Sequence, residues 1–244
     1  MEKLPNIVEI VNSMFSQSRI IVVNGRKYVV KNYTSEAGLV KWLLVKTAGV
    51  TAKVYPYTVD PSERMSREVL FIDSMKNIID LPRVIIKDWI SKVVVREFVE
   101  GEVFSPSSGV REYRSIGRLL AVIHSHGFAL GDTKFQNFVK SKTGYYVIDG
   151  EQAVRTDDYS YMYWDVMVFC VTCTYGLISS KPMGSLRKMQ EYIAGFLEGY
   201  VEEGGRKAER VISVYNRFNY KGLAYVLLPT PYNLYYFRVI EEFV

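Results

Sequence analysis

Short apolar runs rich in β-branched residues, typical of strands, recur within the first hundred residues. The runs Arg19 to Val23 and Arg26 to Val30 are rich in β-branched residues and flank Asn24-Gly25. An Asn-Gly pair between two such runs is the strongest short-range signal for a β-hairpin. Further short runs predict an antiparallel meander of strands; they lie at residues 39–45, 50–57, 83–86 and 92–95.

From residue 60 onward, apolar residues recur mostly with the helical period. The segment Asp60-Pro61-Ser62-Glu63 combines an N-cap residue, a proline in the first turn and a capping acid, so a helix is expected to begin there. Its apolar face also carries Glu68, which is costly to bury unless a cation meets it. Other amphipathic or apolar stretches predict further helices, at residues 5–16, 110–126, 166–175, 186–201 and 208–218. Strands followed by helices favour an α+β class.

Composition limits the possible class of protein only slightly. The chain has 244 residues, 48% of them hydrophobic, and a net charge of +5, which is ordinary for a soluble globular protein. No secretory signal opens the chain, and the apolar run Val166 to Ile178 is too short to span a bilayer, so we expect a cytoplasmic protein without membrane insertion. Cys170 and Cys173 lie in an apolar helical pattern and are expected to be buried free thiols. The mild positive charge permits nucleic acid only as an indirect partner.

Candidate chemistry concentrates between Phe128 and Glu151. Asp132, Lys134 and Asn137 fall in one short loop, and a following apolar strand ends at Asp149. Carboxylate and amide oxygens with one ammonium, all held at the ends of regular elements, suit a site for Mg²⁺ and phosphate. In phosphoryl transfer an aspartate can orient the attacking hydroxyl, while a lysine offsets charge on the moving group.

This stretch resembles the catalytic and metal-binding segments of the protein kinase-like superfamily, D-x-K-x-x-N followed by a strand and I-D-x-x. The small atypical members look most similar, namely the RIO group and the kinase of the KEOPS tRNA-modification complex, with the lipopolysaccharide-core kinases more distant. The resemblance covers roughly Val30 to Gly176. It implies a bilobal α+β fold with an antiparallel-sheet N-lobe, residues 1–99, and a mainly helical C-lobe, residues 100–244. The N-terminal helix and hairpin look like additions to it.

The resemblance also implies roles. The expected reaction transfers the γ-phosphoryl group of ATP to a hydroxyl. In it Asp132 orients the acceptor, Lys134 offsets charge, and Asn137 and Asp149 hold Mg²⁺. The remaining expected positions bind the nucleotide. Lys53, paired with Glu68, contacts the phosphates, and the loop Ser35, Glu36, Ala37 and Gly38 covers them. The backbone of Glu97 and Val99 contacts the adenine edge.

Some positions depart from the pattern. Arg96 stands beside the adenine pocket where the family is usually apolar, and Glu151 takes the third position of D-F-G. His124 and Asp165 match structural positions of the family: His124 is expected to have a packing or capping role, and Asp165 to tie the backbone of the catalytic loop.

Four functions therefore compete. An atypical serine/threonine protein kinase comes first, followed by a kinase for a sugar or other small molecule. The other two are a nucleotide-binding pseudokinase scaffold and an ATPase within a tRNA-modification assembly.

Overall fold

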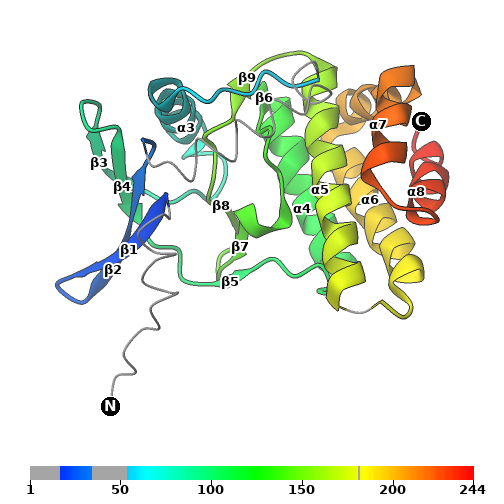
Figure 1. Ribbon diagram of the computed structural model, residues 1–244, viewed down its shortest axis with the longest axis horizontal. Coiled ribbons are helices and arrows are strands. Elements are labelled where there is room, and N and C mark those ends of the chain that lie inside the picture. The colour runs from blue at the N-terminus through cyan, green and yellow to red at the C-terminus, as the bar shows by residue number, and fades with distance from the viewer. Residues whose placement is uncertain (1–16, 35–53, 181) are drawn as a thin grey trace.

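The computed structural model describes residues 17–34, 54–180 and 182–244. A sheet and one helix form the N-terminal part of the molecule, and a group of helices forms the C-terminal part, with the catalytic segment between them (Figure 1). The expected α+β class, with an antiparallel sheet in the N-terminal part and mainly helices in the C-terminal part, is confirmed. The division at residue 99 stays a prediction.

The N-terminal sheet is antiparallel and four-stranded, in the order β1-β2-β4-β3. Asn24 and Gly25 join the first two strands, and both have the positive φ values, 51° and 75°, that a tight hairpin turn requires. The hairpin is thus part of the central sheet, because its second strand pairs with β4; the expectation that it is an addition was wrong. The strands are β1 (Ser18–Val23), β2 (Arg26–Asn32), β3 (Val84–Asp88) and β4 (Val93–Glu97).

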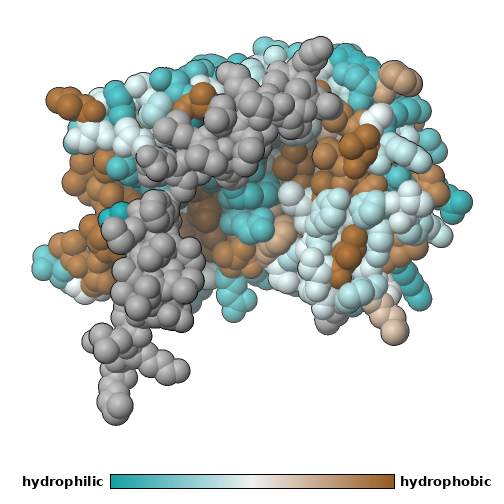
Figure 2. Space-filling view, in the orientation of Figure 1, coloured by the Kyte–Doolittle hydropathy of each residue, from teal (hydrophilic) through white to brown (hydrophobic). Residues whose placement is uncertain are grey.

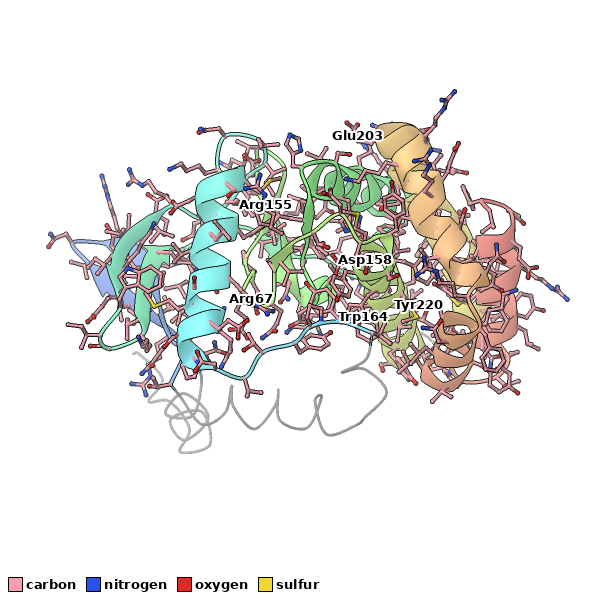
Figure 3. The ribbon with its side chains drawn as sticks, turned by 90° about the horizontal axis from the view of Figure 1, so that it is seen from above. Arg67, Arg155, Asp158, Trp164, Glu203 and Tyr220 are labelled. Carbon is pink, nitrogen blue, oxygen red and sulfur yellow. The ribbon has the colours of Figure 1, made fainter. Side chains whose placement is uncertain are left out.

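Helix α3 (Pro61–Met75) begins as the sequence predicts. Asp60 is the N-cap and accepts a hydrogen bond from the Glu63 backbone N–H at 2.7 Å. The Glu63 carboxylate does not complete a reciprocal capping box; it accepts instead from the Thr58 hydroxyl, which in turn accepts from the Asp60 N–H. In the view from above, α3 stands between the sheet and the helical part (Figure 3).

Two small sheets hold the catalytic segment. Strands β5, β7 and β8 pair in that order, and β6 pairs with β9. The loop with Asp132 and Lys134 emerges from β6 and ends in a short 3₁₀ turn, Phe135–Asn137. The strands are β5 (Glu102–Val103), β6 (Phe128–Ala129), β7 (Phe138–Lys140), β8 (Tyr145–Val147) and β9 (Val154–Arg155).

The C-terminal part is helical. Its helices are α4 (Val110–Ser125), α5 (Tyr159–Ser180), α6 (Ser185–Ser213), α7 (Phe218–Leu227) and α8 (Tyr232–Glu241), with a 3₁₀ turn at Val214–Asn216. Two helices were expected where α6 lies; they meet without a loop at Gly205, whose backbone is non-helical (φ 51°, ψ −137°). Cys170 and Cys173 are buried free thiols, as predicted.

Helix α5 is long and apolar enough to cross a membrane by length and composition, but 67% of its most apolar stretch is buried inside the protein. It packs against α6 and α7, which is the environment of a core helix. Absence of membrane insertion and a cytoplasmic location stay predictions.

Apolar side chains also gather outside the core, on the N-terminal sheet. Figure 2 shows them at the left of the view, over β1 to β3. The exposed members there include Ile20, Val22, Ile85, Ile86 and Ile90.

Several predicted segments lie outside the described residues: the helix at 5–16, the strand at 39–45, the loop at 35–38 and most of the strand at 50–57. The described end of that last segment, residues 54–57, is a turn and irregular chain rather than a strand.

Candidate active site

Lys31 on β2 joins the sheet, helix α3 and the segment after β8. Its ammonium lies 2.6 Å from Glu68 Oε2, 2.9 Å from Asp149 Oδ1 and 3.1 Å from Glu151 Oε2. The side chain is only 3% exposed. Glu68 therefore does meet a cation on the apolar face of α3, but that cation is Lys31. The expected pairing of Glu68 with Lys53 stays a prediction, because Lys53 lies outside the described residues.

The charges in this cluster hold one another ionised. Burial alone disfavours the ammonium of Lys31, but Asp149, Glu151 and Glu68 outweigh it and raise the pKa of Lys31 well above its usual value. Burial likewise opposes ionisation of Asp149, yet Lys31 and then Lys134 lower the pKa of that carboxyl. The pKa of Glu151 is lowered as well, because Lys31 and Arg64 outweigh burial and the nearby charge of Asp149. The charged forms of the Asp149 and Glu151 carboxylates are therefore favoured.

One face of helix α3 packs against the segment Asp149-Gly150-Glu151. Arg64, fully buried, donates to Glu151 Oε2 at 2.8 Å. Seven residues further along α3, the Phe71 ring packs so close to Gly150 that a Cβ there would lie 2.8 Å from Cδ1. This close packing explains why a residue without a Cβ stands at position 150.

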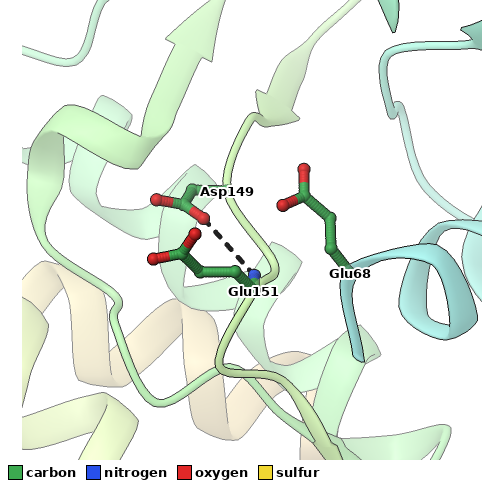
Figure 4. Close-up of side chains that lie close together, drawn as sticks. All are labelled: Glu68, Asp149 and Glu151. Atoms are coloured by element: carbon green, nitrogen blue, oxygen red, sulfur yellow. Dashed lines mark hydrogen bonds between the residues drawn. The ribbon is translucent and has the colours of Figure 1, made fainter. Parts of the chain in front are cut away.

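Figure 4 shows the carboxylates of Glu68, Asp149 and Glu151 converging from α3 and this segment. Their oxygens lie within 4.8 Å of one another, a spacing that suits a cation, and the Lys31 ammonium already occupies it. The Glu151 backbone N–H also donates to Asp149 Oδ1 at 3.3 Å. Asp149 is thus held in place from two sides, by a lysine and by a main-chain amide.

The loop that contains Asp132 is held by Asp165, which lies in the second turn of α5. Its carboxylate accepts from the backbone N–H groups of Leu130 and Gly131, both at 2.6 Å. His124 lies 3.1 Å from the same carboxylate and 2.6 Å from the Tyr200 hydroxyl. The structural roles predicted for Asp165 and His124 are confirmed by these contacts.

Within the loop, the Lys134 ammonium donates to Asp132 Oδ2 at 2.7 Å. The Asn137 amide nitrogen donates to the Asp132 carbonyl, also at 2.7 Å. Asp132 and Lys134 are partly exposed, at 13% and 25%, whereas Asn137 is buried. The loop therefore presents the carboxylate and the ammonium outward and holds the amide inside.

Two adjoining cavities bring most of the described candidate residues together. The first, about 310 Å³, is lined by Lys31, Arg96, Asn137 and Asp149 among others. The second, about 160 Å³, is lined by Glu97, Phe98 and Val99 together with Val29 and Ile148. Val29, Arg96, Phe98 and Ile148 border both, so the two spaces form one continuous site.

Two other cavities lie nearby. One, about 670 Å³, is lined by Lys134, Phe135, Tyr175 and further residues of α5. The other, about 720 Å³, lies between the end of α3, α4 and the β7–β8 hairpin. It is larger but contains none of the predicted site residues, so its size alone does not mark it as the site.

Sequence reasoning missed Lys31, Arg64 and the contacts of Glu151. A signal for Lys31 was present, because it continues the apolar run of β2 at Val29-Val30 and a lysine there must find a charge or water. The unpaired Glu68 on α3 was the complementary signal. The predicted loop residues Ser35, Glu36, Ala37 and Gly38 lie outside the described residues.

Comparisons with known proteins find similarity among solved structures. No protein-family model matches the sequence, and no curated protein sequence matches it. Among solved structures, the chain is similar to the crystal structure of choline kinase LicA from Streptococcus pneumoniae, with a TM-score of 0.45 and 12% sequence identity over 97% of each chain. A likeness this distant carries no argument about activity, which must come from the geometry of the site.

Proposed function

We propose that this protein is a Mg²⁺-dependent phosphotransferase that moves the terminal phosphoryl group of a nucleoside triphosphate to a hydroxyl. One observation carries the proposal. Lys31, tethered by Glu68 and Asp149, stands on the wall of a cavity that Asn137 also lines. A cation held by a helix-borne glutamate, beside an aspartate and an asparagine, is the arrangement by which kinases position nucleotide phosphates and metal.

The donor set fits Mg²⁺, which prefers oxygen ligands and takes only one or two from the protein. Asp149 uses Oδ1 for Lys31 and the Glu151 N–H, so Oδ2 is the oxygen proposed for the metal. Asn137 commits its amide nitrogen to the Asp132 carbonyl, which leaves the amide oxygen for the same purpose. When bound, the metal would neutralise charge on the phosphates.

Asp132 and Lys134 supply the remaining chemistry in this proposal. The Asp132 carboxylate accepts the hydrogen bond of the acceptor hydroxyl and orients its oxygen toward the phosphoryl group. Lys134, 2.7 Å from that carboxylate, offsets the negative charge that spreads over the transferred group. Lys31 holds the non-transferred phosphates on the other side of the site.

The acceptor is the finer part of the proposal. A serine or threonine of a protein is the first expectation from sequence. However, β9 and a short connection are all that separates Asp149 from α5, which leaves little surface for a peptide. The cavity of about 670 Å³ beside Lys134 has the size of a small-molecule site. These features favour a small hydroxyl-bearing acceptor.

The substitution Asp132→Asn tests the proposal. We expect phosphotransfer to fall by two orders of magnitude or more, while nucleotide binding and the melting temperature stay near those of the wild type. Nucleotide consumption should be measured with proteins, with sugars and amino alcohols, and without acceptor. Unchanged turnover in the variant would remove the assignment of Asp132, and binding without any turnover in the wild type would remove the enzyme.

A second candidate function is a nucleotide-binding scaffold without catalysis. The observation that favours it is that Lys31 is already neutralised within the protein. Its ammonium contacts three carboxylates, one of them that of Glu151. Thermal stabilisation by Mg-ATP or Mg-GTP, with no consumption under any acceptor condition, would support the scaffold over the enzyme.

A further inference from the structure

Arg96 on β4 is a buried cation whose hydrogen-bonding capacity is not used within the described part of the chain. The residue is 6% exposed. Its closest charged partner is Glu68, with Nη1 3.7 Å from Oε1, and its Nε has no hydrogen-bond partner. Burying a guanidinium without hydrogen bonds is costly, so a ligand that accepts hydrogen bonds would complete this position.

The position of Arg96 indicates which part of a ligand would reach it. Arg96 borders both the cavity with Lys31 and Asp149 and the adjoining cavity with Glu97 to Val99. Under the proposed function the first cavity holds phosphates and the second holds the base, with the backbone after Arg96 along the base edge. The guanidinium then faces the inner end of the base.

The chemistry of the guanidinium distinguishes the purines. Arginine offers only donors. Adenine presents a donor, the N6 amino group, next to its N7 acceptor, whereas guanine presents two neighbouring acceptors, O6 and N7. An arginine at the inner end of the pocket opposes the adenine amino group and can pair with both acceptors of guanine.

We propose that Arg96 makes this site selective for a guanine nucleotide over an adenine nucleotide. The inference rests on the proposed function, because it assumes a nucleotide in the two cavities. It changes the expected donor from ATP to GTP. The competing role for Arg96 is a contact to the phosphates, which would not depend on the base.

Isothermal titration calorimetry on the full chain with Mg²⁺ and the β,γ-methylene analogues of ATP, GTP and ITP tests it. Hypoxanthine, the base of ITP, keeps O6 and N7 but lacks the 2-amino group, so it isolates the groups that Arg96 would contact. We expect the GTP and ITP analogues to bind about tenfold or more tightly than the ATP analogue, the discrimination typical of a good bidentate arginine pair.

Arg96→Met should abolish this preference, since methionine has a similar length and no donors. Arg67→Met is the matched control: Arg67 on α3 pairs with Glu63 and the Pro56 carbonyl, and it borders neither cavity. It should keep the wild-type ranking. If Arg96→Met does not fold, the ranking of the three analogues on the wild type still decides.

The outcomes separate the two proposals. Binding of the ATP analogue as tight as that of the GTP analogue overturns the inference and leaves the proposed function standing. Equal weakening of all three analogues in Arg96→Met assigns Arg96 to the phosphates and also overturns it. Failure of every analogue to bind the wild type removes the proposed function and the inference together.

Discussion

The two halves of this protein have interiors of opposite character. Beneath the N-terminal sheet, the side chains of Lys31, Glu68 and Glu151 are buried together with two arginines. In the helical half the core is aromatic: the Phe169 ring is fully buried and packs against several other rings. These neighbouring rings are Phe104, Tyr113, Phe138 and Phe196.

This difference distinguishes the candidate site, which lies in the charged N-terminal interior, from the aromatic core that stabilises the fold. Burying paired charges contributes little net stability, because desolvation offsets most of their attraction. An aromatic core stabilises through the apolar area that it removes from water. A charged interior is therefore better explained by a ligand than by folding. The helical half has its own buried carboxyl group, Asp165, and this group holds the backbone of the loop that contains Asp132.

A substitution of Lys31 is the strongest test of this contrast between the charged interior and the aromatic core. Lys31→Met leaves three carboxylates without their shared cation, so we expect a loss of about 3–5 kcal/mol in unfolding free energy and loss of nucleotide binding. Chemical denaturation and calorimetry measure the two effects.

Lys27→Met is the control, because Lys27 lies on the same strand and pairs with Glu100 at the surface. It should change stability by less than about 1 kcal/mol. Equal effects of the two lysine variants would contradict the charged-site interpretation.

A core truncation in the helical half should separate stability from binding. Phe169→Ala leaves a cavity among several aromatic rings, so we expect a loss of about 3–5 kcal/mol in unfolding free energy. Because the residue touches no group of the charged site, the molecules that remain folded should bind nucleotide with wild-type affinity. Urea denaturation and calorimetry at low temperature measure both, and a parallel loss of affinity would show that the two halves are coupled.

The link between α3 and the Asp149 segment can be measured by a double-mutant cycle. Glu151→Gln keeps the shape but removes the charge that Arg64 and Lys31 contact, and Arg64→Met removes the buried cation. We expect a coupling energy of about 1–3 kcal/mol between the two positions. Hydrogen exchange of the backbone at residues 149–153 should speed up in each single variant. A coupling near zero would indicate that Phe71 and Gly150 hold the segment alone.

The smallest effect concerns pH and the helical half. Burial lowers the pKa of His124 from its ordinary value of 6.5, against the raising influence of Asp165, and Lys207 lowers it further. The folded state therefore binds fewer protons than the unfolded state, so His124 favours folding fully above pH 6.5 and progressively less as pH falls below it.

Unfolding free energy measured from pH 7.5 to 5.5 should fall in the wild type. His124→Gln, which can still bond to Tyr200 and Asp165, should flatten that slope. An unchanged slope in the variant would assign the pH dependence to other groups.

Local signals in the sequence were sufficient for much of the fold. Asn24-Gly25 predicted a hairpin and Asp60-Pro61 predicted the start of a helix, because each depends on backbone geometry that neighbouring residues set. The D-x-K-x-x-N spacing placed Asp132, Lys134 and Asn137 in one loop for the same reason. Strand pairing across the sheet was not predictable in this way, which is why the hairpin was mistaken for an addition.

The sequence by itself therefore determined that Asp132, Lys134 and Asn137 share one loop and that Glu68 needed a cation. Only the tertiary structure decided that this cation is Lys31, 37 positions from Glu68 and 118 from Asp149 along the chain. The physical reason is that a lysine in an apolar strand requires a counter-charge, but the local sequence does not show which residue provides it. The pairing of β2 with β4 and the packing of α3 against the sheet bring Lys31 and Glu68 together.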